Sequence, residues 1–186
     1  MRKLIYALNV SLDGYFEGPD GDLSWSVPDE ELHRHFNELD RRIDLHLYGR
    51  RLYENMAAFW PTAEEDPGAS PVEIEYARIW KQMPKVVFSK SLTSVGWNSR
   101  LVQTDAAREV RALKAQPGGD MSVAGAELAG SLMQSGLVDE YRVYIHPVVI
   151  GSGRPMFPPM RDLLKLKFIE TRTIGSGVVL LSYRSI

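Results

Sequence analysis

The stretch "LHLYGRRLYENM" (residues 45–56) joins an apolar run directly to a helix-like pattern. The apolar run ends at Gly49 and predicts a short strand. The pattern that follows Arg50 and Arg51 predicts a helix. The stretch therefore predicts a strand that passes into a helix, with one glycine and two cations at the junction.

Strand-like and helix-like segments alternate outward from this junction. Strands are predicted at residues 3–11, 44–49, 85–89, 100–104 and 120–125, and a long one within residues 138–151. Helices are predicted after Pro28, at residues 50–60 and 70–83, after Thr104, and at residues 126–136. This alternation is typical of an α/β fold with a mostly parallel central sheet and helices on both faces. Residues 166–174 and 177–186, joined by Gly-Ser-Gly, predict a C-terminal antiparallel hairpin.

Several helix starts carry local signals. Pro28 suits the first turn of a helix. The apolar residues that follow it recur at helical spacing: Leu32, Phe36, Leu39 and Ile43. Ser70 and Glu73 form a capping-box pattern, and Thr104 is expected to cap the next helix.

The composition excludes several classes of protein. The 186 residues predict a single domain (1–186), and a formal net charge of −2 offers no basic excess for nucleic acid. The absence of cysteine excludes disulfides, thiolate catalysis and cysteine-ligated metals. No apolar run approaches the roughly 20 residues of a membrane span, and the four histidines show no metal-ligand spacing. We therefore expect a cytoplasmic protein that acts on a small molecule, without a metal, nucleic-acid or membrane partner.

Three strand-to-helix junctions carry groups suited to an anion: Gly49-Arg50-Arg51, Ser89-Lys90-Ser91 and Gly125-Ala126-Glu127. Ligands of open α/β sheets sit at the carboxyl ends of the strands, where helix N-termini favour phosphate. Each junction also has an ordinary explanation as surface arginines, a polar loop, or a glycine that starts a helix. Together they favour one extended phosphorylated ligand.

Asp13, in "SLDGY", follows the first predicted strand on the same side. It is a candidate for orienting a substrate or moving a proton, or simply the aspartate of an Asp-Gly turn. Other glycine motifs are incomplete: "GAELAGSL" lacks the P-loop lysine, and "GSGRPMF" lacks the third glycine of a dinucleotide fingerprint. Neither an ATPase nor an ordinary Rossmann enzyme is supported.

Five segments, in this order, resemble the RibD C-terminal domain family: "NVSLDGYF" (9–16), "LYGRRLYE" (47–54), "VVFSKSL" (86–92), "VAGAELAGSLMQSGLVDEY" (123–141) and "HPVVIGSGRPMF" (146–157). The resemblance covers nearly the whole chain. It implies a dihydrofolate reductase-like fold, NADPH as cofactor, and hydride transfer to a small heterocyclic substrate. The family's reaction in riboflavin biosynthesis reduces 5-amino-6-(5-phosphoribosylamino)uracil. The resemblance also implies a homodimer.

The resemblance implies cofactor contacts at the three junctions, from Gly49, Arg50, Arg51 and Leu52, from Ser89, Lys90 and Ser91, and from Ala124, Gly125 and Ala126. It places the 2′-phosphate of NADPH near Ser89 and Lys90, and the pyrophosphate near Gly125. Glu127 would lie near the substrate, together with Asp13 as a polar group that faces it.

Two positions depart from the family pattern. Leu52 stands where the family has threonine, and Ala124 stands where it has the first glycine of a pair. The resemblance therefore leaves an alternative, an NADP-binding protein of the same fold without reductase turnover.

Overall fold

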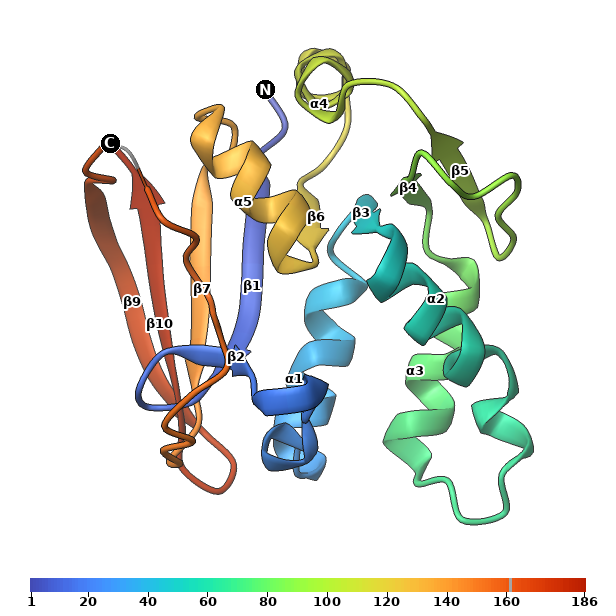
Figure 1. The fold of residues 1–186 in the computed structure, drawn as a ribbon. Helices are drawn as coiled ribbons and strands as arrows, with labels where there is room; N and C mark the ends of the chain where they lie inside the picture. Colours follow the sequence, from blue (N-terminus) through green and yellow to red (C-terminus); the bar gives the residue numbers. More distant parts are fainter. Residues whose placement is uncertain (161) are drawn as a thin grey trace.

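The computed structural model describes residues 1–160 and 162–186, which form an eight-stranded sheet with helices packed against it (Figure 1). The strand order is β5-β4-β3-β6-β1-β7-β10-β9. The strands are β1 (Leu4–Val10), β3 (Leu45–Gly49), β4 (Lys85–Phe88), β5 (Ser99–Val102), β6 (Met121–Ala124), β7 (Glu140–Ile145), β9 (Leu166–Ile174) and β10 (Val178–Ser185). Neighbours from β5 to β7 are parallel, whereas β10 runs antiparallel to both β7 and β9. The predicted mostly parallel sheet and C-terminal hairpin are confirmed.

Both faces of the sheet are covered by helices. The helices are α1 (Glu30–Asp40), α2 (Arg50–Phe59), α3 (Pro71–Gln82), α4 (Ala106–Ala115) and α5 (Ala126–Gln134). Leu47 of β3 packs in the apolar cluster of α4 and α5, and the next residue, Tyr48, packs in the cluster of α2 and α3. In β4, Val86 likewise packs in the cluster of α4 and α5, and Val87 packs in the cluster of α2 and α3. Successive strand residues point to opposite faces, so strands covered on both sides are apolar throughout.

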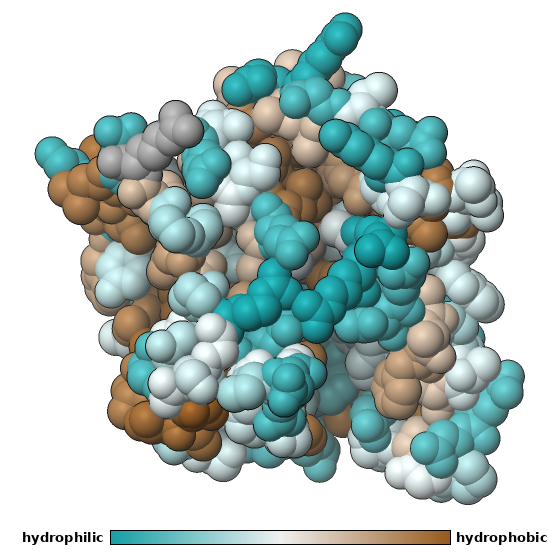
Figure 2. Space-filling view, viewed as in Figure 1, coloured by the Kyte–Doolittle hydropathy of each residue, from teal (hydrophilic) through white to brown (hydrophobic). Residues whose placement is uncertain are grey.

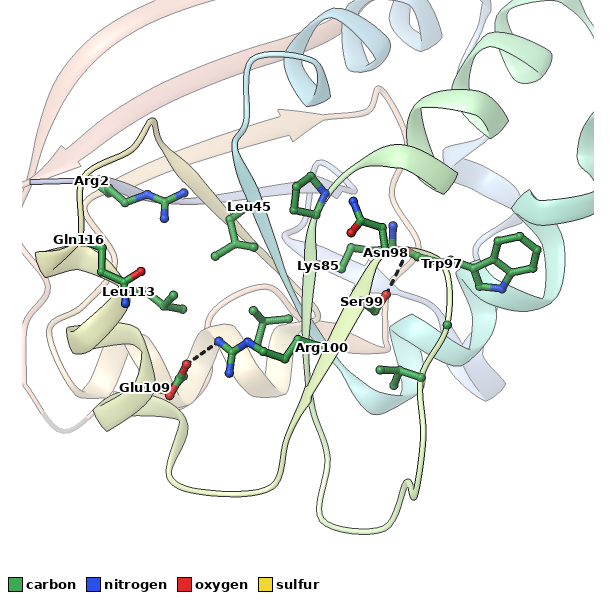
Figure 3. Close-up of a pocket in the computed structure, with 14 residues that line it drawn as sticks. Arg2, Leu45, Lys85, Trp97, Asn98, Ser99, Arg100, Glu109, Leu113 and Gln116 are labelled. Atoms are coloured by element: carbon green, nitrogen blue, oxygen red, sulfur yellow. Dashed lines mark hydrogen bonds and ion pairs between the residues drawn. The ribbon is translucent and has the colours of Figure 1, made fainter.

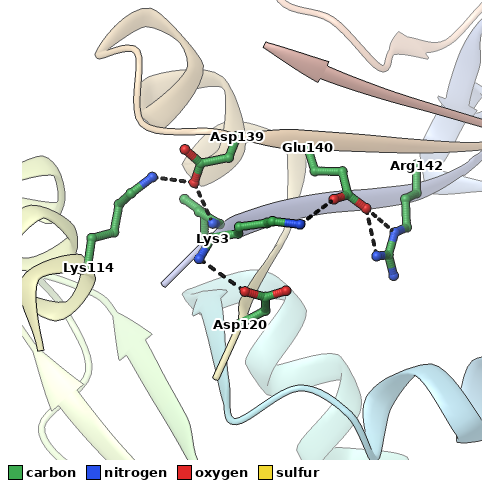
Figure 4. A network of polar contacts seen from close by, with 7 residues as sticks. Lys3, Lys114, Asp120, Asp139, Glu140 and Arg142 are labelled. Carbon is green, nitrogen blue, oxygen red and sulfur yellow. Dashed lines mark hydrogen bonds and ion pairs between the residues drawn. The ribbon is translucent and has the colours of Figure 1, made fainter. Parts of the chain in front are cut away.

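Charged groups hold the amino ends of the strands together (Figure 4). The carboxylate of Asp139 pairs with Lys114 of α4. Glu140 of β7 accepts a hydrogen bond from Nε of Arg142 at 2.8 Å and pairs with Lys3 at 3.6 Å. These contacts lie at the end of the sheet opposite the strand-to-helix junctions. They therefore fix the scaffold without occupying the predicted ligand side.

Two predicted helix starts are wrong by one or two residues. Pro28 lies outside α1, because Asp29 is the N-cap and its carboxylate accepts the N–H of Leu32 at 2.9 Å. Asp105, and not Thr104, caps α4 with its side chain. In both cases a carboxylate beside the predicted residue supplies the acceptor that a helix N-terminus needs.

The capping box of Ser70 and Glu73 is confirmed at the start of α3. Ile43, predicted as part of the apolar stripe of the first helix, lies beyond the end of α1. The helix predicted at residues 50–60 is α2, which ends at Phe59, and Pro61 lies in a 3-10 helix, Trp60–Glu65, that continues directly from it. None of the helices in the described residues has the length and apolar character of a membrane span.

A two-stranded ribbon lies where the sequence predicted only loops. β2 (Tyr15–Glu17) and β8 (Arg154–Pro155) pair antiparallel. A Cβ atom on Gly153 would lie 2.1 Å from the carbonyl oxygen of Glu17, so this close approach requires glycine. The long strand predicted within residues 138–151 is only β7, and the chain after it turns back to form the ribbon.

Candidate functional site

The three predicted junctions lie at the carboxyl ends of adjacent strands. β3 runs between β4 and β6, so Gly49, Ser89 and Gly125 come together at one end of the sheet. A Cβ atom on Gly125 would lie 3.9 Å from the backbone nitrogen of Gly49. Residues far apart in the sequence therefore meet where a ligand of an open α/β sheet binds.

The helices at the two glycine junctions lack a capping side chain. Gly49 is the N-cap of α2 and Gly125 is the N-cap of α5, and neither supplies a side-chain acceptor. Asp29, Ser70 and Asp105 supply one for α1, α3 and α4. The first N–H groups of a helix have no partner within it, and they lie at the positive end of the helix dipole. The two adjacent uncapped N-termini therefore form an anion-binding arrangement.

Gly125 has a backbone conformation that favours glycine, with a φ of +98°. A Cβ atom there would lie 3.8 Å from that of Leu52. Leu52 and Ala124, the two departures from the family pattern, both pack against the apolar cluster that contains Trp80. Their side chains therefore contribute to the core beneath the junctions, and Leu52 offers no hydroxyl to a ligand.

A pocket of about 450 Å³ opens between the carboxyl ends of β4 and β5. Ser89 and Lys90 line it. The Ser89 hydroxyl accepts the N–H of Ser91 at 3.2 Å and of Leu92 at 3.0 Å, and so shapes the turn that carries the exposed Lys90. The predicted Ser89-Lys90-Ser91 junction therefore borders a cavity at the start of α4, whose N-cap Asp105 also lines it, and this cavity follows the strand next to β3.

A larger pocket, of about 830 Å³, lies at the other end of the sheet (Figure 3). Its cations already have partners. Arg100 pairs with Glu109 at 2.5 Å. Lys85 donates to the carbonyl oxygens of Trp80 and Met83 at the end of α3, and burial lowers the pKa of this lysine to about 8. These side chains stabilise the scaffold, and we place the functional site at the junctions instead.

Arg51 is one member of a charged chain that crosses the site. Its guanidinium donates to the Glu17 carboxylate at 3.0 Å. The other oxygen of Glu17 lies 3.6 Å from Arg154, which donates to Glu127 at 3.0 Å. Figure 2 shows hydrophilic side chains across the middle of this face, in the region of β2 and the start of α2. The ribbon therefore joins the first turns of α2 and α5.

Sequence reasoning singled out Arg51 and Glu127 but missed Glu17 and Arg154. Glu17 follows an aromatic pair in a glycine-rich segment, and Arg154 lies between glycine and proline. Neither position carries a local signal, because their contact depends on the pairing of β2 with β8.

Asp13 lies at the same end of the sheet, in the turn after β1, and holds a neighbouring loop. Its carboxylate accepts the N–H of Ile150 at 3.3 Å and of Gly151 at 2.8 Å. The Ser11 hydroxyl, together with these N–H groups, lowers the pKa of Asp13. Asp13 is therefore an anion at neutral pH whose oxygens position the segment between β7 and β8.

A histidine follows β7 at this end of the sheet. Nε2 of His146 lies 3.1 Å from the side-chain oxygen of Asn9, and its ring meets Trp25 edge-on with centroids 5.5 Å apart. Burial lowers the pKa of His146, so its ring is neutral at pH 7. Across the described residues, no cluster of histidine and carboxylate side chains is arranged to hold a metal ion.

Known proteins share this fold and part of this sequence. A family model for the RibD C-terminal domain matches residues 2–180. The uncharacterized protein YyaP of Bacillus subtilis (strain 168) is 35% identical over 183 residues, covering 98% of this chain and 94% of that protein. A putative riboflavin biosynthesis protein from Shewanella sp. PV-4 matches with a TM-score of 0.78 at 21% identity, covering 99% of both chains. A dihydrofolate reductase from Enterococcus faecalis, solved with NADP(H), matches with a TM-score of 0.63 at 9% identity, covering 98% of this chain and 96% of that one. The two structural matches establish the fold.

Proposed function

The chain belongs to the RibD C-terminal domain family, and we propose that it is an NADPH-dependent reductase that transfers a hydride to a small heterocyclic substrate. The chain has the same fold as dihydrofolate reductase. Family membership supports a reductase, and the proposal for this chain rests on its own junctions.

The observation that carries the proposal is the pair of uncapped helix N-termini. The starts of α2 and α5 are next to each other, at Gly49 and Gly125, and lack the side-chain caps that the other three helices described above possess. Unpartnered N–H groups from two helices suit the two linked phosphates of a dinucleotide. Arg50 and Arg51 extend this arrangement from the first turn of α2.

The neighbouring junction, Ser89-Lys90-Ser91, suits the 2′-phosphate of NADPH. The pocket between β4 and β5 is lined by Ser89 and Lys90, and Lys90 is exposed. A cation and a hydroxyl at this point would hold the 2′-phosphate that distinguishes NADPH from NADH. Gly125 would permit close approach of the pyrophosphate, because the N-cap position of α5 carries no side chain.

The hydride comes from NADPH when that cofactor is bound, and the chain positions the reactants. Asp13 holds the loop at Ile150 and Gly151 beside the end of β1. Glu127, on the first turn of α5, can accept a hydrogen bond from a polar substrate group. The neutral His146 ring and Asn9 add polar groups at the ends of β7 and β1.

The alternative is an NADP-binding protein without turnover. Leu52 removes the hydroxyl that the family pattern places at the start of α2, and this observation keeps the alternative in view. Calorimetric titration with NADPH and NADH tests binding first. If neither cofactor binds with a dissociation constant below about 1 mM, both candidates are refuted. Oxidation of NADPH in the presence of pterins or pyrimidines would then favour the reductase, whereas tight binding with no oxidation across the panel would favour the alternative.

A further inference from the structure

Glu17 is a nearly buried carboxylate with a cation on each oxygen. Its side chain is 10% exposed. One oxygen accepts from Arg51 at 3.0 Å, and the other lies 3.6 Å from Arg154. Among the described residues of β2, β8 and the first turns of α2 and α5, the cations are Arg50, Arg51 and Arg154. Glu17 therefore binds two of these three.

Arg51 and Arg154 differ in how far their guanidinium donors remain available to a ligand. The Arg51 side chain is 59% exposed, so it retains donors for a cofactor phosphate. Arg154 is more enclosed, with Glu17 on one side and Glu127 on the other, and its guanidinium lies 5.3 Å from the centre of the Phe16 ring. Arg154, the cation of the β2–β8 ribbon, is thus already paired with two carboxylates in the absence of a ligand.

The charges of this group sum to zero, with Arg51 and Arg154 against Glu17 and Glu127. A phosphate monoester brings about two negative charges at neutral pH. A phosphate that approached Arg154 would come close to the buried Glu17 carboxylate, which lies 3.6 Å from that guanidinium, and the two like charges would repel each other. An uncharged heterocyclic ring would not be repelled by the Glu17 carboxylate.

We propose that Glu17 is a built-in counter-anion for Arg154 and Arg51, and that the site accordingly takes a heterocyclic substrate without a phosphate group. This inference rests on the proposed reductase function. It names the substrate class that a charge-compensated site accepts, and it separates this chain from a reductase of phosphoribosyl compounds.

The test measures phosphate binding directly. Ribose 5-phosphate is titrated against the wild-type chain, Glu17→Gln and Glu127→Gln, and ribose serves as the uncharged probe. We expect Glu17→Gln to bind ribose 5-phosphate at least about tenfold more tightly than the wild type, with no comparable gain for ribose. Glu127→Gln changes the formal charge equally, but Glu127 is 88% exposed, so we expect a gain below about threefold.

Two double variants locate the gain. Adding Arg154→Met to Glu17→Gln should abolish it, whereas adding Arg51→Met should leave most of it. A gain that depends only on Arg51 would place the phosphate on the cofactor side and refute the proposal. Tight binding of ribose 5-phosphate by the wild type, or no gain in Glu17→Gln, would also refute it.

Folding and function are controlled separately. If Glu17→Gln does not fold, as judged by circular dichroism, Glu17→Ala provides the same loss of charge with room for water around the arginines, and the wild-type titration remains decisive on its own. NADPH titration is run in parallel. Failure of NADPH to bind, with the phosphate pattern intact, would overturn the reductase and leave the role of Glu17 standing. Normal NADPH binding, with no gain in ribose 5-phosphate affinity in Glu17→Gln, would refute the role of Glu17 and leave the reductase proposal standing.

Discussion

Gly125 lies against Leu52, since a Cβ atom added to the glycine would be 3.8 Å from that of the leucine. The start of α5 therefore sits directly on the first turn of α2, and a Cβ atom at position 125 would fill the space between them at ordinary van der Waals distance. The φ of +98° at Gly125 adds conformational strain to any such substitution, of about 1–2 kcal/mol. We expect Gly125→Ala to weaken NADPH binding at least about tenfold in a calorimetric titration.

Gly136 provides a matched control for this substitution. It lies just beyond the other end of α5, with a φ of +64° and open space around its Cβ position. Gly136→Ala should therefore also introduce backbone strain at a positive φ, but without affecting the junction. An equal loss of NADPH affinity in both variants would show that Gly125 acts through stability alone.

Lys90 is expected to distinguish the two nicotinamide cofactors. It is exposed and lines the pocket at the end of β4, so its charge is available to a 2′-phosphate. We predict that Lys90→Ala raises the dissociation constant for NADPH by about tenfold and changes that for NADH by less than about twofold. Lys167→Ala, on the exposed strand β9, is the control. Equal losses for both cofactors in Lys90→Ala would remove this lysine from the 2′-phosphate.

The junctions could be predicted from the sequence because each is local. A strand pattern, a glycine and a helix pattern at residues 45–56 suffice to define the start of α2, and their order along the chain places them on the same end of a parallel sheet. The capping residues show the limit of this reasoning. Thr104 and Asp105 are both good caps, and only the backbone geometry selects the second.

The charged chain through Glu17 could not be predicted in this way. The partner of Glu17 on β8 is decided by a two-residue strand inside a loop, and such a strand has no periodicity to detect. The sequence predicts Arg51 as a contact of the cofactor or a surface arginine and gives no sign of its pairing with Glu17. Long-range pairing of short strands sets the electrostatics of the site, and sequence spacing does not report it.

Stability should fall on mild acidification because of a histidine in the central sheet. His46 of β3 is buried, its Nδ1 lies 2.9 Å from the Ser122 hydroxyl, and burial lowers the pKa of the folded state below the ordinary value of 6.5. Below that pH the unfolded chain takes up a proton that the folded chain does not, so the free energy of unfolding decreases as the pH falls. Above it this contribution is fully present.

We expect urea unfolding to give a lower free energy of unfolding at about pH 5.5 than at about pH 7.5, by about 1 kcal/mol or more. His46→Gln removes the titrating group and should show a smaller decrease over the same range, even if it is less stable at neutral pH. An undiminished decrease in this variant would assign the effect to other groups.

Dimer formation stays a prediction, and the structure gives it a specific form. β9 is the outer strand of the sheet, with Phe168 55% and Ile169 45% exposed. Long exposed edge strands pair readily with another chain. Antiparallel pairing of two copies about Thr171 would set Glu170 opposite the partner subunit's Arg172 twice, by symmetry. We therefore expect light scattering to give twice the chain mass of 21.0 kDa.

A charge swap tests this pairing more sharply than the mass alone. Glu170→Arg would place arginines opposite each other on both sides of the symmetry axis, and we expect this variant to run as a monomer, because directly opposed like charges destabilise paired strands. Adding Arg172→Glu restores opposite charges in the reverse order, and the double variant should recover the dimer. Arg172 also donates to Nδ1 of His35 at 2.7 Å, so Arg172→Glu alone serves as the second single control. A monomeric wild type, or a dimer that persists in both single variants, would exclude pairing through β9.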